Sequence, residues 1–401
     1  MLSTKPFFVL TINPALIVFK QSLLFCFLAC TVQFASSANH YVAIPLDDFS
    51  DVIKHWHDQN TGGGDDYYKP EQILEIANNL LLYQRANGGW PTNKDPLRKL
   101  NSSEAEKIRS AINALDSSLD NRNTYPQIRY LAAVFQQTQK TIYRDAAIKG
   151  LEYILQHQYP SGGWAHSPPR TDSYYGHITF ADEVMPGVLT LLRQIVEGDT
   201  RFDFVAPALK ARCENALQLG DKLLLQLQLT VNGKPAVWAG QYDRNTLKPA
   251  GGRSYELPSL LSWESVAVVR YLMSIPNPGE SIVEAVENAI DWFEAVKIEG
   301  IAIEKFDTEP VRFKYHTSSY DLRVVKQKNA APLWARFYDL QTNKPLFANR
   351  DGSQVSSLAE VKRDRRTGYD WYGNWPQKLL DEDYPEWKKR NKPAIKSEAV
   401  Q

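Results

Sequence analysis

The chain has 401 residues, of which 43% are apolar, so it can bury a large core and most of it is not disordered. Its 46 Lys and Arg residues balance its 46 Asp and Glu residues, which excludes recruitment of nucleic acid or an anionic membrane by overall charge. An acidic ligand must therefore be bound by basic side chains that gather locally.

Residues 1–38 have the composition of a secretory signal peptide. Lysines precede an apolar run at residues 22–32, and small residues follow it. The run is too short to span a membrane as a helix. We expect cleavage after Ala38, which leaves residues 39–401 as a single domain that is secreted or periplasmic.

An alternative reading of the leader is lipoprotein processing at Cys30, although the preceding Phe27-Leu28-Ala29 is in a poor order for it. Removal of the leader leaves Cys213 as the last cysteine, so no intrachain disulfide is expected. We expect a monomer that has no membrane partner unless Cys30 carries a lipid.

Beyond the leader, apolar residues recur at helical spacing in several segments, whereas strand-like alternation is limited to pieces such as residues 300–306. The architecture is therefore expected to be mostly α. The predicted amphipathic helices span residues 71–84, 146–158, 184–195, 215–228, 265–275 and 282–296.

Trp90, Trp164 and Trp238 are spaced by 74 residues, and the first two stand in a Gly-Gly-Trp motif. Each follows a Leu-rich helix that ends near a Gln, and each precedes a polar loop and a second helix. A unit that recurs in this way predicts stacked helical hairpins. Closed into a ring, such hairpins would place their loops around a central cleft, with each tryptophan packed on its own hairpin or facing a ligand.

Acidic residues stand near the start of the second helix of each unit, at Asp120, Asp182 and Glu264. Taken singly, each could interact with the helix dipole. Taken together on one face of a repeat, Asp120 and Asp182 indicate a site, to which Asn121 adds an amide. Clustered carboxylate and amide oxygens without a cysteine or a histidine pair favour Ca²⁺ over Zn²⁺.

Arginines near aromatic residues are concentrated after position 240. An anionic sugar chain needs such residues, because guanidinium groups bind carboxylates through two parallel hydrogen bonds. We expect Arg253, Arg323 and Arg336 to bind this ligand. Arg365 and Arg366 are expected instead to pack on aromatic rings and pair with aspartates at the surface.

Among the histidines, His177 lies inside the acid-bearing segment before the second helix, so it is a candidate for substrate binding, metal binding or base chemistry. His55, His57 and His166 are expected to form structural hydrogen bonds.

Seven short segments, taken in chain order, carry a family resemblance. They are Gly88-Gly-Trp-Pro-Thr-Asn, Leu119-Asp-Asn, Gly162-Gly-Trp, Tyr175-Gly-His-Ile-Thr-Phe-Ala-Asp, Trp238-Ala-Gly-Gln-Tyr-Asp, Arg253-Ser-Tyr-Glu-Leu-Pro-Ser and Trp334-Ala-Arg-Phe-Tyr-Asp-Leu. This series resembles the pectate lyases of polysaccharide lyase family 10 over about residues 70–375. The resemblance implies an incomplete (α/α)₃ toroid, which agrees with the repeated hairpins.

The resemblance also implies a calcium-dependent enzyme that cleaves 4-linked polygalacturonate by β-elimination. Such an enzyme removes the proton at C5, α to the carboxylate, and expels the C4 oxygen, which leaves unsaturated oligogalacturonides. Ca²⁺ and arginine would stabilise the charge that builds up on the carboxylate. By position in the segments, the implied roles are calcium and substrate contacts for Asp120, Asn121 and Asp182, carboxylate binding for Arg253 and Arg323, and the base for Arg336.

An arginine base conflicts with the usual chemistry of guanidinium, which stays protonated in proteins. Deprotonation of Arg336 becomes less costly only if other cations, here Arg323 and bound Ca²⁺, lie beside it. The presence of Arg336 in the site is therefore the firmer expectation, and its role as the base depends on such a cluster.

Two residues depart from the family pattern, since Ala181 and Glu183 stand where the family carries Asn and a second Asp or Asn. Two alternatives stay open. One is a family member that binds uronan without catalysis. The other is a lyase or hydrolase of another acidic polysaccharide, with Asp182 and Glu264 as its acid and base.

Overall fold

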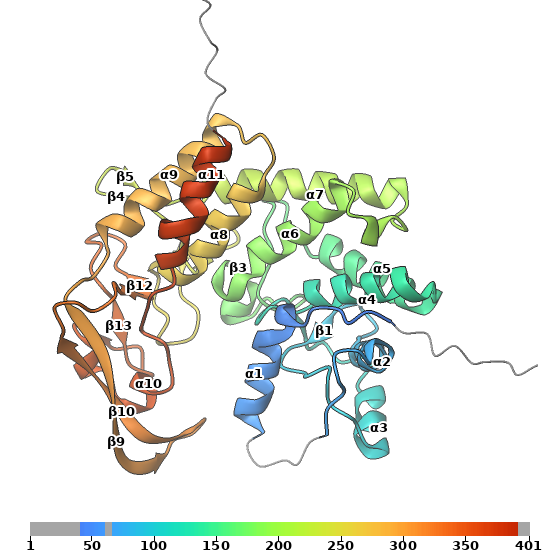
Figure 1. The fold of residues 1–401 in the computed structure, drawn as a ribbon, viewed down its shortest axis with the longest axis horizontal. Helices are drawn as coiled ribbons and strands as arrows, with labels where there is room; N and C mark the ends of the chain where they lie inside the picture. Colours follow the sequence, from blue (N-terminus) through green and yellow to red (C-terminus); the bar gives the residue numbers. More distant parts are fainter. Residues whose placement is uncertain (1–40, 61–65, 392–401) are drawn as a thin grey trace, which may run out of the picture. The chain divides into compact units, whose positions relative to one another are not determined.

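The computed structural model describes residues 41–60 and 66–391, along which helices alternate with short strands (Figure 1). These residues belong to one compact unit. The predicted signal peptide and its cleavage site lie outside the described residues. No helix of the described part of the chain is long and apolar enough to cross a membrane.

The helices range from one turn to about six. They are α1 (Ser50–Gln59), α2 (Ile73–Tyr83), α3 (Ser102–Ser110), α4 (Tyr125–Thr138), α5 (Thr141–Gln156), α6 (Val184–Val196), α7 (Pro207–Gln226), α8 (Ser262–Ser274), α9 (Glu280–Ala295), α10 (Arg363–Arg366) and α11 (Tyr384–Arg390). Two short 3₁₀ segments, η2 (Ser173–Gly176) and η3 (Ala181–Glu183), precede α6.

Most of the strands have two residues, and only β9 and β10 are long. They are β1 (Trp90–Pro91), β2 (Ser117–Ser118), β3 (Ile178–Thr179), β4 (Thr230–Val231), β5 (Lys234–Pro235), β6 (Gln241–Tyr242), β7 (Pro249–Ala250), β8 (Leu260–Leu261), β9 (Ile301–Arg312), β10 (Thr317–Lys326), β11 (Trp334–Ala335), β12 (Phe337–Tyr338), β13 (Phe347–Ala348), β14 (Gln354–Val355) and β15 (Tyr372–Gly373).

The predicted fold class, a mostly α incomplete (α/α)₃ toroid, is wrong. The described residues are about 45% helix and 16% strand, with the strands in many small antiparallel sheets. The loops between the helices pair with one another, as in the three-stranded sheet β3-β6-β7 and the pair β8-β12. A strand of two residues has no alternation that a sequence pattern can reveal, and β9 and β10 are exposed at many positions of both faces.

The six predicted helices are confirmed, as α2 and α5 to α9, with their ends shifted by several residues. Their apolar faces form one large core, in which α4 packs on α5, α6 on α7 and α8 on α9 (Figure 1). Helix α3 was missed because it buries no residue and so has no apolar period. Its N-terminus is instead marked by a capping box, formed by Asn101 and Glu104.

The repeated tryptophans are buried rather than facing a ligand, since Trp90, Trp164 and Trp238 are at most 1% exposed. Each indole N–H donates to a carbonyl of the preceding helix: Leu80 O at 2.8 Å, Ile154 O at 2.9 Å and Leu224 O at 2.7 Å. Trp334 makes the equivalent bond to Phe293 O at 2.8 Å, although it lies outside the 74-residue spacing. Each indole therefore adds a hydrogen bond to a carbonyl in the last turn of the preceding helix.

The glutamine that ends each Leu-rich helix has a matching role. Gln84 donates to the Gly88 and Ala146 carbonyls, and Gln158 donates in the same way to Gly162 and Ala216, all at 2.8–2.9 Å. Each amide therefore joins its own Trp loop to the first helix of the following unit, α5 for Gln84 and α7 for Gln158, so the hydrogen bonds recur along with the helices. Gln228 makes the third such pair of bonds.

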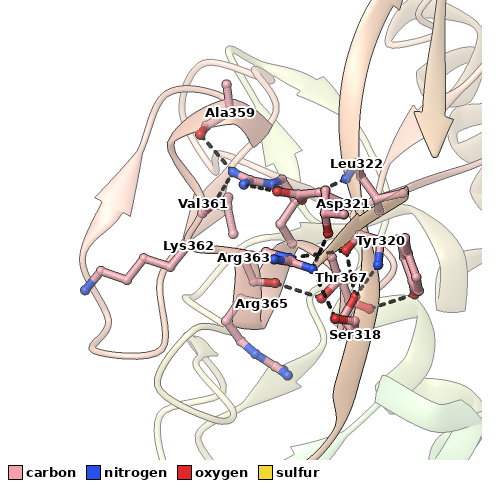
Figure 2. Close-up of polar contacts among 12 residues, drawn as sticks. Ser318, Tyr320, Asp321, Leu322, Ala359, Val361, Lys362, Arg363, Arg365 and Thr367 are labelled. Carbon is pink, nitrogen blue, oxygen red and sulfur yellow. Dashed lines mark hydrogen bonds and ion pairs between the residues drawn. The ribbon is translucent and has the colours of Figure 1, made fainter. Parts of the chain in front are cut away.

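The long hairpin β9–β10 is held against α10 by Arg363, which Figure 2 labels, and by Arg366. Arg363 donates to the Ser318 carbonyl at 3.0 Å and to the Tyr320 carbonyl at 3.2 Å. Arg366 forms a two-bond ion pair with Asp321, with distances of 2.7 and 2.8 Å. The pairing predicted for Arg366 is thus confirmed, and it fixes the hairpin in place.

Candidate active site

Loops that connect the helices, together with the turn between β9 and β10, line an open cavity of about 2060 Å³. Five of the seven predicted site residues line it, namely Asp120, Asn121, Asp182, Arg253 and Arg336. The structure therefore brings together residues that are more than 200 positions apart in the sequence.

Asp120 lies in the turn before α4 and contacts His166, with 3.2 Å between its Oδ2 and the histidine Nε2. Burial alone would raise the pKa of this carboxyl, but His166, Asp182 and Arg253 together outweigh burial and hold the pKa below its ordinary value. The second oxygen, Oδ1, is buried and has no hydrogen-bond partner. Asp120 is thus a charged carboxylate with one oxygen available to a ligand.

Asp182 lies in η3, immediately before α6, in a strained backbone conformation. Asp182 and the following Glu183 have φ angles of 50° and 61°, a left-handed region that costs about 1–2 kcal/mol for each non-glycine residue. Such strain clusters at functional sites. Burial and the nearby charge of Asp120 raise the pKa of Asp182 well above its ordinary value. A cation bound between these two carboxyl groups would relieve their repulsion.

Arg336 lies between β11 and β12 and is only 6% exposed. Its Nη2 donates to Glu264 Oε1 at 2.5 Å and lies 4.0 Å from Asp182 Oδ1. The guanidinium also lies over the rings of Trp263, at 4.4 Å from the centroid, and Tyr369, at 4.6 Å. Arg336 is therefore held rigidly, close to the acidic pair.

Arg323, one of the cations that would make deprotonation of Arg336 less costly, does not line this cavity, and acidic and aromatic groups face Arg336 instead. Burial alone would lower the pKa of Arg336, but Glu264, Tyr369 and Asp182 outweigh it and raise the pKa above its ordinary value. These surroundings favour a permanently charged guanidinium. They give no support to the predicted role of Arg336 as a base, and they suit the binding of a carboxylate.

Arg253 stands on the same wall of the cavity and is about half exposed. It forms an ion pair with Glu256, which outweighs burial and raises the pKa of Arg253. Asn121, next to Asp120, donates through Nδ2 to Asn93 Oδ1 at 2.9 Å. Both side chains are thus positioned by neighbours while they line the cavity.

The structure places two predicted site residues elsewhere, since neither His177 nor Arg323 lines this cavity. The charged groups that act on His177 are Asp243 and Arg244, and burial lowers its pKa. Arg323 is 59% exposed on β10, donates to Glu304 at 2.5 Å, and lines a separate cavity. Sequence position alone could not show that β10 turns this side chain away from the acidic pair.

Several cavity residues were not predicted as part of the site. His166 was interpreted as structural, yet it contacts Asp120, and its place two residues after Trp164 was the available signal. Glu256 follows Arg253 by three residues, a spacing that suits an ion pair. We find no pattern in the sequence that marks Trp263 or Tyr369.

Among the described residues, no group of three or more His, Cys, Asp or Glu side chains could hold a metal ion. The pair Asp120 and Asp182 nevertheless fits a hard cation, because it combines mutual repulsion with an unpaired buried oxygen. Gln241 also lines the cavity with an unpaired, buried amide oxygen. These residues would leave further coordination positions for substrate oxygens or water.

Comparison with known protein families matches residues 84–380 to the family described as pectic acid lyase. The chain belongs to this family. It is therefore a polysaccharide lyase, as the sequence segments indicated. A search of curated proteins found no match.

Two solved structures resemble this lyase over most of its length. Family 10 polysaccharide lyase from Cellvibrio cellulosa is 28% identical, with a TM-score of 0.67, and the match covers 87% of this chain and 98% of the other. An aspartate-to-alanine mutant of that lyase, in complex with trigalacturonic acid, is 27% identical, with a TM-score of 0.65. This match covers 87% of this chain and 99% of the other.

Proposed function

We propose that this polysaccharide lyase is an exported, calcium-assisted pectate lyase that cleaves 4-linked polygalacturonate by β-elimination. The observation that carries the proposal is the grouping of Asp120 and Asp182 with Arg336 and Arg253 in one cavity. The trigalacturonic acid bound by the Cellvibrio enzyme supports the choice of substrate.

The chemical difficulty of this reaction is charge. A galacturonate unit already carries an ionised carboxylate, and loss of the C5 proton places more negative charge on it. Arg336 can bind that carboxylate without being reoriented, since Glu264 and the rings of Trp263 and Tyr369 hold its guanidinium in place. Groups that are fixed in advance stabilise developing charge effectively.

Asp120 and Asp182 would hold Ca²⁺, which when bound supplies Lewis-acid stabilisation of the substrate carboxylate. Arg253, on the same wall, is suited to bind the carboxylate of an adjacent sugar. The alternative of Asp182 and Glu264 as an acid and base pair is disfavoured, because Glu264 is 2% exposed and committed to Arg336.

The first test is the ultraviolet absorbance of polygalacturonate digests. We expect absorbance to rise with Ca²⁺, since the new double bond absorbs, and to stop rising when a chelator removes the cation. Binding of polygalacturonate without any rise in absorbance, even in excess Ca²⁺, would contradict the proposal and identify a uronan-binding protein instead. Activity that survives chelation would contradict the calcium requirement alone.

Export is supported by the composition of residues 1–38 alone. When the full chain is expressed with a secretion system, we expect the mature protein outside the cytoplasm to begin at Asn39. N-terminal sequencing and mass spectrometry would check this, and a lipid-modified N-terminus at Cys30 would support the alternative anchor. An intact leader on protein retained inside the cell would contradict export.

A further inference from the structure

One wall of the cavity carries guanidinium groups and tyrosine rings in alternation. Arg336 lies over Tyr369, with 4.6 Å to the ring centroid. Arg253 lies near two rings, at 5.7 Å from the centroid of Tyr369 and 5.3 Å from that of Tyr255. The two tyrosines contact each other edge to face, with their centroids 5.2 Å apart. These four side chains form a series that begins with Arg336, beside Asp182.

The alternation continues beyond Tyr255 through two more arginines. Arg365 lies over Tyr255 at 4.7 Å, a ring that Arg336 does not contact. Arg350 lies 5.9 Å from the same ring and 4.8 Å from the ring of Tyr315, which belongs to the turn between β9 and β10. All of these side chains line the one cavity.

Arg365 differs from the other arginines of α10. Arg363 and Arg366 are committed to the β9–β10 hairpin, whereas Arg365 points away from that network (Figure 2). It is 5% exposed, and its buried Nε has no hydrogen-bond partner. A buried guanidinium without a full set of acceptors is destabilising, so an acceptor supplied by a ligand at this Nε would be stabilising.

The charge around Arg365 is also uncompensated. Asp364 pairs with Arg350 at 2.7 Å, but it lies 3.9 Å from Arg365 Nε, so one carboxylate faces two guanidinium groups. Arg312, the last residue of β9, and Lys314, in the turn that follows, also line the cavity and add further positive charge. This end of the cavity is therefore suited to an anion.

We propose that Arg365, Arg350 and Tyr315 form a further subsite, which binds a galacturonate unit remote from the bond that is cleaved. This inference rests on the proposed function. A polyuronate presents a carboxylate and an apolar sugar face on every unit, and the wall offers guanidinium groups for the former and tyrosine rings for the latter. The subsite makes the enzyme favour long chains over short ones.

The test compares oligogalacturonates of increasing length, from the trimer to the polymer. For Arg365→Gln we expect KM on the polymer to rise about tenfold with kcat unchanged, the effect of losing one charge-assisted hydrogen bond. The trimer occupies the fewest positions along the series, so its KM should rise least. Tyr315 is 60% exposed, so Tyr315→Ala should show the same dependence on length without a risk to folding.

Arg109→Gln is the matched control, because Arg109 is 60% exposed on α3, outside the cavity. The inference is overturned if both cavity variants change KM by the same factor at every length, or do not change it at all. Wild-type enzyme that makes no unsaturated product from any length refutes the proposed function instead. In that case calorimetric titration with the same oligomers still tests the subsite. The inference then requires that both variants bind long chains more weakly than the wild-type protein does.

Discussion

Replacement of Arg336 by Lys is expected to lower kcat on polygalacturonate by about a hundredfold or more, which is typical of the loss of one preorganised stabilising donor. A lysine can keep a positive charge beside Glu264, so the buried carboxylate is not left unpaired. It lacks the planar fork of arginine, however, and cannot pair with Glu264 and a substrate carboxylate in fixed directions at the same time. Binding of oligogalacturonate should persist, since Arg253 remains in the cavity.

Turnover of Arg336→Lys would be followed by the absorbance of unsaturated products, and binding by calorimetric titration with oligogalacturonate. Thermal unfolding would confirm that the variant is folded. The exposed Arg109 offers a control, since Arg109→Lys changes the same atoms outside the cavity. If Arg336→Lys keeps wild-type turnover, neither proton removal nor charge stabilisation depends on the Arg336 guanidinium.

Replacement of Gly162 by Ala is expected to lower the free energy of unfolding by about 3 kcal/mol or more, because it combines backbone strain with a clash. Gly162 has a φ of 104°, which disfavours any residue with a side chain. An added Cβ would also lie 2.3 Å from the Leu219 carbonyl oxygen on α7. The Gln158 amide holds the Gly162 carbonyl and a carbonyl of α7, so the loop cannot move away without breaking those bonds.

Gly198 provides the matched control for this prediction. Its φ is 86°, but an added Cβ would meet nothing within 4 Å, so Gly198→Ala should cost only about 1 kcal/mol of backbone strain. Urea denaturation of both variants would give the difference between their free energies of unfolding. Equal losses for the two would show that the Trp loop is free to adjust, and would contradict the tight loop packing described for the repeat.

The helices could be predicted because their signal is local. Each of the six predicted segments repeats its apolar residues within one or two turns, and that period corresponds to a buried face in the structure. The Gly-Gly-Trp motif was informative for the same reason, since its glycines and tryptophan act on the end of the adjacent helix. The overall class could not be predicted in this way, because it depends on which loops pair across the fold.

The acidic half of the site was accessible from the sequence, whereas the basic half was only partly so. Asp120 and Asp182 hold equivalent places in the repeat, so the repeat itself predicts that they meet. The arginines hold no such equivalent places. Arg336 is held beside the acids by its hydrogen bond to Glu264, which lies 72 residues earlier in the chain. Arg323 instead pairs with Glu304 on the neighbouring strand.

The family, the positions of the main helices, the repeated tryptophan loops and the pair of acids could all be inferred from the sequence, whereas the burial of the tryptophans could not. These depend on short-range periodicity and on segments that recur in order. Only the tertiary structure decided which arginines face the cavity, what compensates their charge, and that Arg365 points away from its own helix's ion-pair network. The physical reason is that the surroundings of a charge are set by residues far apart in the chain, whose meeting depends on packing and on loop pairing.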